Sequence, residues 1–204
     1  NYRSLIRSNL ENSLNNLGDK IDTLFFHNPL DSQLLLNDPE FFKNIILDYP
    51  VSTLGVSVYE PNEVIKLFES EFELSFQFPF NILDRRFEHV KMPKGKRYAR
   101  SIFLQGILAS SNFFRSSTTS ELHYLSNKYH NMLVSCDLDP ISVAISFVTI
   151  SDVVDYFLIG VDSIRQLKEI ANYDQYDQNK MASIDIKSLD VNNHWLDPRN
   201  WSLK

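Results

Sequence analysis

The sequence predicts an α/β domain of repeated strand–helix units, arranged as part of a (β/α)8 barrel rather than as a whole one. Three observations lead to this prediction. Short apolar runs bounded by Gly or Pro alternate with segments whose apolar residues recur at helical spacing. The connections between the runs are too long for hairpins, so neighbouring strands should run parallel. About five such units are present, whereas a closed barrel of this type has about eight.

The composition is that of an ordinary globular chain, and we expect one domain over residues 1–204. Its 20 Lys and Arg against 26 Asp and Glu give a net charge of −6, which argues against non-specific nucleic-acid binding. The single cysteine, Cys136, excludes an internal disulfide and favours the cytoplasm. No stretch approaches the ~20 apolar residues of a membrane span. The first four residues are no signal peptide and lead directly into a helical pattern, so we expect a barrel that lacks its N-terminal strands.

The elements follow from apolar spacing and from their Gly and Pro boundaries. The expected strands are 22–26, 53–58, 73–78, 98–104 and 156–159. The expected helices are 4–17, one that begins at Pro39, 61–70, 120–134, 140–150, 163–172 and one near 177–189. Residues 81–96 are expected to be irregular and basic. Within this region the Lys-rich loop of residues 87–97, broken by Pro93 and Gly95, is expected to be solvated surface rather than a binding patch. A looser stretch is expected at 110–120.

In a barrel of parallel strands, chemistry sits at the C-terminal ends of the strands. No Gly-x-Gly-x-x-Gly follows any of the expected strands, which argues against a doubly wound dinucleotide fold. The residues to consider are therefore those at the strand ends, which are 27–28, 57–59, 77–81, 100–105 and 160–163.

Six motifs at and beyond these ends occur in one order along the chain. They are Leu-Phe-Phe-His-Asn-Pro (24–29), Leu-Gly-Val-Ser-Val-Tyr (54–59), Phe-Gln-Phe-Pro-Phe-Asn-Ile-Leu-Asp-Arg-Arg (76–86), Arg-Ser-Ile-Phe-Leu-Gln-Gly (100–106), Ile-Gly-Val-Asp-Ser-Ile-Arg-Gln-Leu-Lys-Glu (159–169) and Leu-Asp-Pro-Arg-Asn-Trp (196–201). Together they resemble the C-terminal two-thirds of an aldo-keto reductase, a barrel that reduces aldehydes and ketones with a nicotinamide cofactor. The likeness is greatest to a branch often encoded near surface-polysaccharide genes. It implies NAD or NADP and a carbonyl or alcohol substrate, either small or sugar-like, as partners.

His27 occupies the place of the family's active-site histidine, which orients and polarises the substrate carbonyl. Taken alone, a histidine beside a proline is more often an ordinary core or loop residue. Ser57 and Gln77 match positions that hydrogen-bond the nicotinamide carboxamide, since a hydroxyl and an amide together supply a donor and an acceptor. The alternative for Ser57 is a hydroxyl bonded to its own backbone. Relatives usually carry Asn after this serine, where Val58 stands here.

The resemblance implies that the middle of the cofactor is contacted by Arg100, Ser101 and Phe103. Arg100 matches the residue that stacks on the nicotinamide, and a guanidinium plane can stack in this way. Ser101 and Phe103 match a loop that packs on the pyrophosphate. The alternative for this segment is a barrel-wall strand with alternating faces.

The adenosine end of the cofactor maps to residues 160–169. Gly160 followed by a helix N-terminus suits an anion, and Ser163 is expected to cap that helix. Asp162 and Gln166 stand where relatives that prefer NADP carry Arg or Lys, which favours NAD, although Arg165 lies nearby. The resemblance makes Glu169 an acceptor for the adenine amino group.

The family's catalytic Asp, its Tyr proton donor and its Lys precede the matched part, and Tyr59 lies on the wrong strand to replace the Tyr. A second hypothesis is therefore a non-catalytic remnant that keeps nucleotide affinity. A metal enzyme is a third, but the five histidines show no metal-ligand spacing at a shared strand end. An open barrel remnant is also expected to be marginal in stability.

Overall fold

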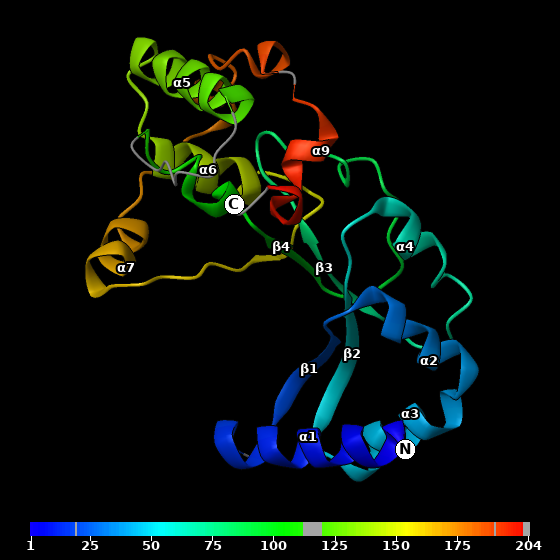
Figure 1. Cartoon of the computed structure of the whole chain (residues 1–204). Coiled ribbons are helices and arrows are strands. Elements are labelled where there is room, and N and C mark those ends of the chain that lie inside the picture. Colours follow the sequence, from blue (N-terminus) through cyan, green and yellow to red (C-terminus); the bar gives the residue numbers. More distant parts are fainter. Residues whose placement is uncertain (19, 112–119, 190, 202–204) are drawn as a thin grey trace. The chain divides into compact units, whose positions relative to one another are not determined.

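The computed structural model describes residues 1–18, 20–111, 120–189 and 191–201, and Figure 1 shows strands and helices alternating along the chain. The strands are β1 (Ile21–Phe26), β2 (Val51–Ser57), β3 (Ser75–Pro79), β4 (Arg97–Arg100) and β5 (Tyr156–Phe157). Their order is β1-β2-β3-β4-β5, and β1/β2, β2/β3 and β4/β5 pair in parallel. The predicted α/β class with a parallel sheet is confirmed.

Nine α-helices accompany these strands in the described part of the chain. They are α1 (Tyr2–Leu17), α2 (Gln33–Asn37), α3 (Pro39–Asp48), α4 (Pro61–Ile65), α5 (Ser120–Ser135), α6 (Pro140–Thr149), α7 (Ile164–Ala171), α8 (Gln178–Met181) and α9 (Asn193–Leu196). Short 3-10 turns occupy Pro29–Ser32, Leu104–Gly106, Ile186–Ser188 and Pro198–Asn200. The looser stretch expected at 110–120 lies mostly outside the described residues.

The strand expected from Glu73 begins at Ser75, and the strand expected to reach Ile159 ends at Phe157. Three other expected elements differ more. The strand expected to reach Leu104 ends at Arg100, because Ser101 takes a φ of 57°, which no strand accommodates. The helix expected to reach Ser70 ends at Ile65, after which hydrogen bonds between residues three apart replace the helical pattern. The helix expected near 177–189 is two short turns, since Asp185 caps a separate 3-10 turn.

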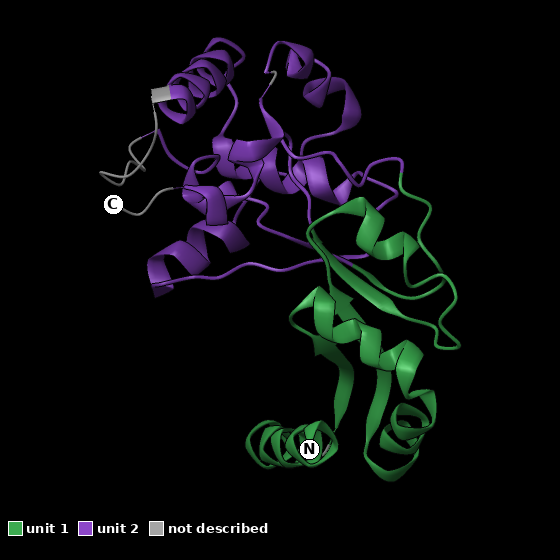
Figure 2. Cartoon of the chain, turned by 45° about the vertical axis from the view of Figure 1, so that its right-hand side comes forward, with its two compact units in different colours: residues 1–78, 90–97 green, residues 79–89, 98–204 purple. Residues whose placement is uncertain are grey.

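The chain divides into two compact units, coloured in Figure 2. Unit 1 contains Asn1–Phe78 and Val90–Arg97, and unit 2 contains Pro79–His89 and Tyr98–Lys204. The single domain expected over residues 1–204 stays a prediction.

Unit 1 is built on the β1–β2 pair. The parallel register sets Phe25 opposite Gly55 and Phe26 opposite Val56. A Cβ at Gly55 would lie 2.6 Å from the Phe25 ring, so a glycine is needed where that ring crosses the neighbouring strand. The core beneath the pair includes Phe42 of α3, which packs against the Phe26 ring with centroids 5.3 Å apart.

Unit 2 is built on α6, whose residues from Ser142 to Val148 are all buried. Phe147 stacks on Phe80, with ring centroids 5.4 Å apart. The fully buried Asn81 joins two loops of this unit. Its Nδ2 donates to the Ser101 carbonyl at 3.0 Å, and its Oδ1 accepts from the N–H of Asp84 at 2.9 Å. The turn after β4 is therefore anchored to the turn after β3.

No single helix in the described ranges is long and apolar enough to cross a membrane. The bent pair Glu121–Ser135 and Pro140–Thr149 reaches the required length and hydropathy only when both helices are taken together, and they meet at 93°.

Candidate functional site

Three of the predicted site residues gather at one edge of the sheet in unit 1. Phe26 lies opposite Val56, and Ser57 lies opposite Gln77 in the parallel register. His27 directly follows β1, Ser57 ends β2, and Gln77 lies in β3. Because parallel strands end at the same edge, the imidazole, hydroxyl and amide groups come from neighbouring positions there.

Ser57 and Gln77 are in direct contact at this edge. The Ser57 hydroxyl lies 3.5 Å from Gln77 Oε1, at the long end of hydrogen bonding, so the contact is weak. Ser57 is buried and Gln77 is half-buried. The pair therefore presents one hydroxyl and one carboxamide. Because the hydrogen bond between them is weak, hydrogen bonds to a ligand can replace it at little cost.

Val58 is fully buried and its side chain has no polar group, so it offers no counterpart to the Asn of the aldo-keto reductases. Its backbone N–H donates to the Gln77 carbonyl at 2.8 Å, which extends the strand pairing by one residue. The polar side chains of this edge are thus those of His27, Ser57 and Gln77, without a contribution from position 58.

His27 is exposed at the start of a tight turn. The Asn28 side chain caps this turn by accepting a hydrogen bond from the Leu30 N–H at 3.0 Å. The backbone carbonyl of Asn28 accepts from the Asp31 N–H, also at 3.0 Å. The turn fixes the backbone immediately after His27. A buried core histidine, one of the two alternatives considered for this position, is not what the structure has.

In unit 2, Arg100 ends β4, and Ser101 and Phe103 lie on the sharp turn that follows rather than on a strand. The barrel-wall alternative for Ser101 and Phe103 is therefore wrong. Ser101, Leu104 and Gln105 have φ values of 57°, 43° and 55°. Such left-handed backbone costs free energy in non-glycine residues and occurs where the surroundings enforce it. The Ser101 carbonyl is held by Leu104 N–H at 2.8 Å, and Arg100 Nη1 lies 3.5 Å from Ser101 Oγ.

Asn81 is a positioning residue that the site prediction left out, although it stands inside the motif of residues 76–86. Its side chain accepts from the backbone two and three residues ahead and donates to Ser101. The sequence signal for this role is an asparagine two residues after the end of a strand, where its side chain can hydrogen-bond the backbone of the following turn.

The N-terminus of α7 collects the residues predicted for the adenosine end. Ser163 caps the helix, as expected, by accepting from the Gln166 N–H at 3.2 Å. Gln166 Oε1 in turn accepts from the Asp162 N–H at 2.7 Å. Glu169 forms an ion pair with Arg165 at 3.3 Å. A Cβ at Gly160 would meet no atom within 4 Å, so the backbone there is open to approach.

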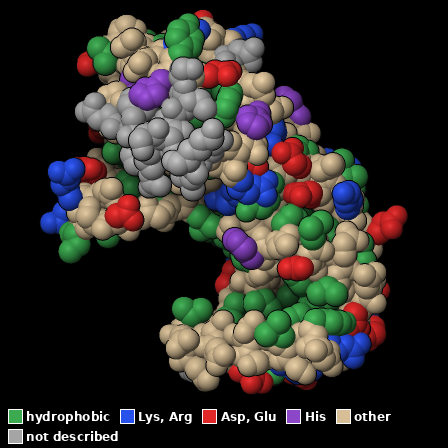
Figure 3. Space-filling model, in the orientation of Figure 1, with side chains coloured by type: hydrophobic (Ala, Val, Ile, Leu, Met, Phe, Trp, Pro, Cys, Tyr) green, Lys and Arg blue, Asp and Glu red, His purple; other side chains and the backbone are tan. Residues whose placement is uncertain are grey.

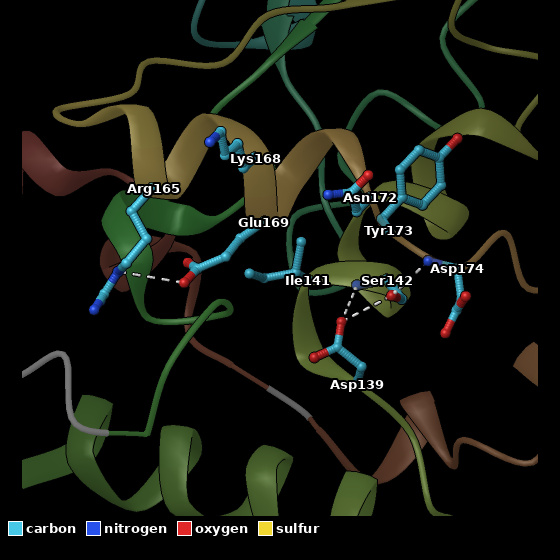
Figure 4. Close-up of a pocket in the computed structure, with 9 residues that line it drawn as sticks. All are labelled: Asp139, Ile141, Ser142, Arg165, Lys168, Glu169, Asn172, Tyr173 and Asp174. Carbon is cyan, nitrogen blue, oxygen red and sulfur yellow. Dashed lines mark hydrogen bonds and ion pairs between the residues drawn. The ribbon is translucent and has the colours of Figure 1, made fainter.

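A pocket of about 520 Å³ lies between α7 and the start of α6. Figure 4 shows its lining, which is Asp139, Ile141, Ser142, Arg165, Lys168, Glu169, Asn172, Tyr173 and Asp174. Asp139 Oδ2 accepts from the N–H and from the hydroxyl of Ser142, each at 2.8 Å, and thereby caps α6. Glu169 is the one predicted site residue in this lining. Within the described ranges, no three His, Cys, Asp or Glu side chains gather as a metal site.

The fold is similar to that of solved aldo-keto reductases. The aldo-keto reductase AKR11C1 from Bacillus halodurans, in its apo form, matches 93% of this chain with a TM-score of 0.67 and 19% identity, over 69% of its own length. The glycerol dehydrogenase AKR11B4 from Gluconobacter oxydans matches 93% of this chain with a TM-score of 0.66 and 19% identity, over 65% of its length. The aldo-keto reductase MGS-M4, from a Medee basin deep-sea metagenome library, matches 88% at a TM-score of 0.61 and 15% identity, over 63% of its length.

No family model and no curated protein matches the sequence. The structural matches show that this chain has an aldo-keto-reductase-like fold consistent with part of a (β/α)8 barrel. The chain spans between 63% and 69% of the length of the three solved structures.

Proposed function

We propose that this chain belongs to an oxidoreductase of the aldo-keto reductase type and binds a nicotinamide dinucleotide. The reaction is hydride transfer between the nicotinamide and a small carbonyl or alcohol, sugar-like in the branch that the sequence resembles. The observation that carries the proposal is the edge of unit 1, where Ser57 and Gln77 touch at 3.5 Å and His27 follows the neighbouring strand.

The Ser57–Gln77 pair fits a carboxamide. A carboxamide needs an acceptor for its NH2 group and a donor for its carbonyl, and Gln77 Oε1 and the Ser57 hydroxyl supply one of each. Their mutual bond is long, so little is lost when a ligand replaces it. A bound nicotinamide supplies or accepts the hydride.

His27 has the role of polarising the substrate carbonyl. His27 is exposed and begins a turn whose backbone is fixed by Asn28, so its imidazole is accessible to a substrate. Hydrogen-bond donation to a carbonyl oxygen stabilises the negative charge that develops there during hydride addition.

Arg100, Ser101 and Phe103 are proposed to contact the middle of the cofactor, and Gly160, Ser163 and Glu169 its adenosine end. The N-terminus of α7 fits NAD better than NADP. Gln166 already occupies the Asp162 N–H, and the Asp162 carboxylate would repel a 2′-phosphate. We therefore propose NAD as the preferred cofactor.

The alternative is a nucleotide-binding protein without catalysis. It is favoured by one observation: Ser57 and Gln77 can hold a carboxamide by hydrogen bonds alone, which requires no reacting group. Both functions require cofactor binding, and they differ in turnover. Binding of NADH without reduction of any aldehyde, ketone or sugar in a panel would favour the alternative.

The experiment is a calorimetric titration of the whole chain with NADH and with NADPH. We expect saturable NADH binding that weakens about tenfold in Gln77→Ala, which corresponds to the loss of ~1.4 kcal/mol. Gln33→Ala is the matched control, since Gln33 is exposed on α2 of the same unit. A folded chain that binds neither nucleotide would overturn the proposal.

Glu169 needs a second control because it is ion-paired. Glu169→Ala removes both the proposed adenine contact and the pair with Arg165. Arg165→Ala removes the pair alone. We expect NADH affinity to fall in Glu169→Ala and to hold in Arg165→Ala, whereas equal losses would give Glu169 a structural role only.

A further inference from the structure

We infer that Asp84 and Arg86 are positioning residues for the turn that follows β4, and that they act on this turn through Asn81. The turn contains residues 101–106 and is called the β4 turn. The inference rests on the proposed function, because the conformation of the β4 turn matters for a cofactor only if the chain binds one. It adds to that function two residues that hold the binding turn without contacting the cofactor.

The β4 turn needs support from other segments because three of its non-glycine residues have left-handed backbone. Ser101, Leu104 and Gln105 have φ values of 57°, 43° and 55°. Such backbone costs free energy and persists only where the surrounding structure enforces it. A hydrogen bond from the Leu104 N–H to the Ser101 carbonyl at 2.8 Å closes the turn locally. The remaining support described for its first residue comes from the segment after β3.

That segment holds two consecutive carbonyl groups at the start of the β4 turn. The Phe80 N–H donates to the Arg100 carbonyl at 3.1 Å, and Asn81 Nδ2 donates to the Ser101 carbonyl at 3.0 Å. The first bond joins two backbone groups and so does not depend on a side chain. The second is lost whenever the amide of Asn81 turns away. The conformation of Asn81 therefore decides whether the Ser101 carbonyl is held.

Asp84 sets the conformation of Asn81. Asn81 Oδ1 accepts from the N–H groups of Leu83 at 3.0 Å and Asp84 at 2.9 Å, and the Asn81 N–H donates to the Asp84 carbonyl at 3.1 Å. Because Oδ1 faces two donors, the NH2 group has to face the Ser101 carbonyl. Both backbone groups of Asp84 thus bond Asn81, so a displacement of Asp84 would displace the amide.

Arg86 in turn holds the side chain of Asp84. The Asp84 carboxylate is fully buried, and Arg86 binds it as a fork, with Nε on Oδ1 and Nη2 on Oδ2, each at 2.8 Å. A buried ion pair adds little net stability over apolar residues of similar volume, so its value lies in the conformation that it fixes. A continuous chain of bonds therefore runs from Arg86 through Asp84 and Asn81 to Ser101.

The surroundings of the β4 turn suit an anion such as the pyrophosphate of a dinucleotide. Figure 3 shows a group of basic side chains at the surface beside β4, the strand that leads into the turn. Arg100, the last residue of that strand, lies with Nη1 3.5 Å from Ser101 Oγ. Positive charge attracts the anion, and a turn that is already ordered loses less conformational freedom when it binds. Asp84 and Arg86 thus act on cofactor affinity by keeping the turn ordered.

The test compares the whole chain with the double variant Asp84→Asn, Arg86→Gln, which removes both charges and leaves no unpaired charge buried. The first measurement is amide exchange without nucleotide. We expect faster exchange over residues 101–108 and unchanged exchange in α6, whose buried residues from Ser142 to Val148 report on the rest of the unit. The second measurement is NADH titration, in which affinity should fall about three- to tenfold, the usual effect of ordering one side chain.

Asn81→Ser distinguishes positioning through Asn81 from a general structural role. A serine hydroxyl can still accept from the N–H groups of residues 83 and 84, but it is one bond too short to hold the Ser101 carbonyl. In this background the Asp84→Asn, Arg86→Gln changes should lower NADH affinity no further, because the bond through which they act is already lost. A general loss of stability would instead add to the effect of Asn81→Ser.

Two more variants complete the comparison. Arg199→Gln is the matched control, because Asp197 and Arg199 form a second Asp–Arg pair of the same spacing in unit 2, and it should leave both measurements unchanged. Arg86→Lys keeps the positive charge and loses the fork. It replaces the double variant if that variant does not fold, and the same changes of smaller size are expected from it.

The inference is overturned if exchange over residues 101–108 stays as in the wild type, or if the losses of NADH affinity add in the Asn81→Ser background. Equal effects of Arg199→Gln would also overturn it. A wild-type chain that binds no nucleotide would instead overturn the proposed function. The exchange measurement needs no nucleotide, so it still decides whether Asp84 and Arg86 hold the β4 turn.

Discussion

The side chain of Gln166 turns back over the start of its own helix and accepts a hydrogen bond from the backbone N–H of Asp162 at 2.7 Å. Ser163 accepts from the Gln166 N–H at the same time. Two donors at the N-terminus of α7 are thus satisfied by the helix's own side chains, in the manner of a capping box. A phosphate at this helix start would have to displace Gln166 and to approach the Asp162 carboxylate.

The first prediction is a change in cofactor preference. In the double variant Asp162→Asn with Gln166→Arg, the repulsion is removed and a guanidinium is supplied for a 2′-phosphate. A charge-assisted bond of this kind is worth about 1.5–3 kcal/mol, so the ratio of the NADPH and NADH dissociation constants should fall by about tenfold or more. The measurement is titration with both nucleotides. Asp152→Asn, at another exposed aspartate of unit 2, is the control, and an unchanged ratio in the double variant would contradict the prediction.

The second prediction concerns two buried hydroxyls of α5. The Tyr129 hydroxyl and Ser126 Oγ are buried and have no hydrogen-bond partner among the described residues. Burial, together with the negative charge of Asp139, raises the pKa of Tyr129, so the phenol stays neutral. A buried polar group without a partner costs about 1–3 kcal/mol. Tyr129→Phe should therefore raise the free energy of unfolding by about 1 kcal/mol.

Urea unfolding of the variants tests this second prediction. Tyr176→Phe is the matched control, because the Tyr176 hydroxyl accepts from the Asp139 N–H at 3.1 Å and is also buried. Its loss should lower the free energy of unfolding by about 1 kcal/mol. Equal destabilisation in both variants would mean that the Tyr129 hydroxyl has a partner after all.

The sequence was informative wherever local signals decide the structure. The apolar run before His27 is bounded by Gly18 and Pro29, and it forms β1 as expected. Pro140 opens α6 and Ser163 caps α7, since both residue types are pre-organised for the first turn of a helix. The three site residues of unit 1 share an edge because a parallel register follows from the long crossovers.

The errors arise where contacts between distant residues decide. The segment after Arg100 alternates like a strand, yet Asn81, twenty residues earlier, bonds the Ser101 carbonyl and stabilises a left-handed turn. A hydrogen bond between residues this far apart in the sequence cannot be predicted from the local residue pattern. The hydrogen bond from the Asp162 N–H to Gln166 likewise depends on the side-chain conformation of Gln166, which the spacing of residues in the sequence does not determine. The exposure of Ile164 depends on what the rest of the unit leaves uncovered.

The third prediction concerns acid sensitivity in unit 1. Asp38 accepts from the hydroxyl of Tyr2 and from Arg3 Nε at 2.8 Å, and so ties α1 to the start of α3. The Tyr2 hydrogen bond is the main cause of its lowered pKa; partial desolvation opposes the shift, and Arg3 adds to it. A carboxyl whose pKa is lowered in the folded state stabilises the fold above its unfolded pKa of about 3.9. That contribution is lost as the pH falls through the lower, folded value.

Replacement of Asp38 by Asn should lower the urea midpoint at pH 7, and the midpoints of wild type and variant should converge as the pH falls through the lowered pKa of Asp38 in the folded state. The difference between the two midpoints should shrink steadily below about pH 4, where the unfolded carboxyl begins to take up protons. Asp31→Asn, at an exposed aspartate nearby, serves as the control. A difference that stays constant from pH 7 to pH 3 would exclude titration of Asp38 as the cause.

The fourth prediction tests the crossing of Phe25 over β2. A Cβ at Gly55 would lie 2.6 Å from Phe25 Cε1 and 2.8 Å from Cδ1, closer than carbon atoms approach. Gly55→Ala should therefore lower the free energy of unfolding by about 1–3 kcal/mol, the usual cost of overpacking. In a Phe25→Ala background only the 3.0 Å approach to Thr23 Cγ2 remains, so the same change should cost less, and the double-mutant cycle should report the coupling. Gly160→Ala is the control, because a Cβ there meets no atom within 4 Å, and its effect should stay within about 0.5 kcal/mol. Equal costs at Gly55 and Gly160, or no coupling to Phe25, would mean that Gly55 is required for a reason other than the Phe25 ring.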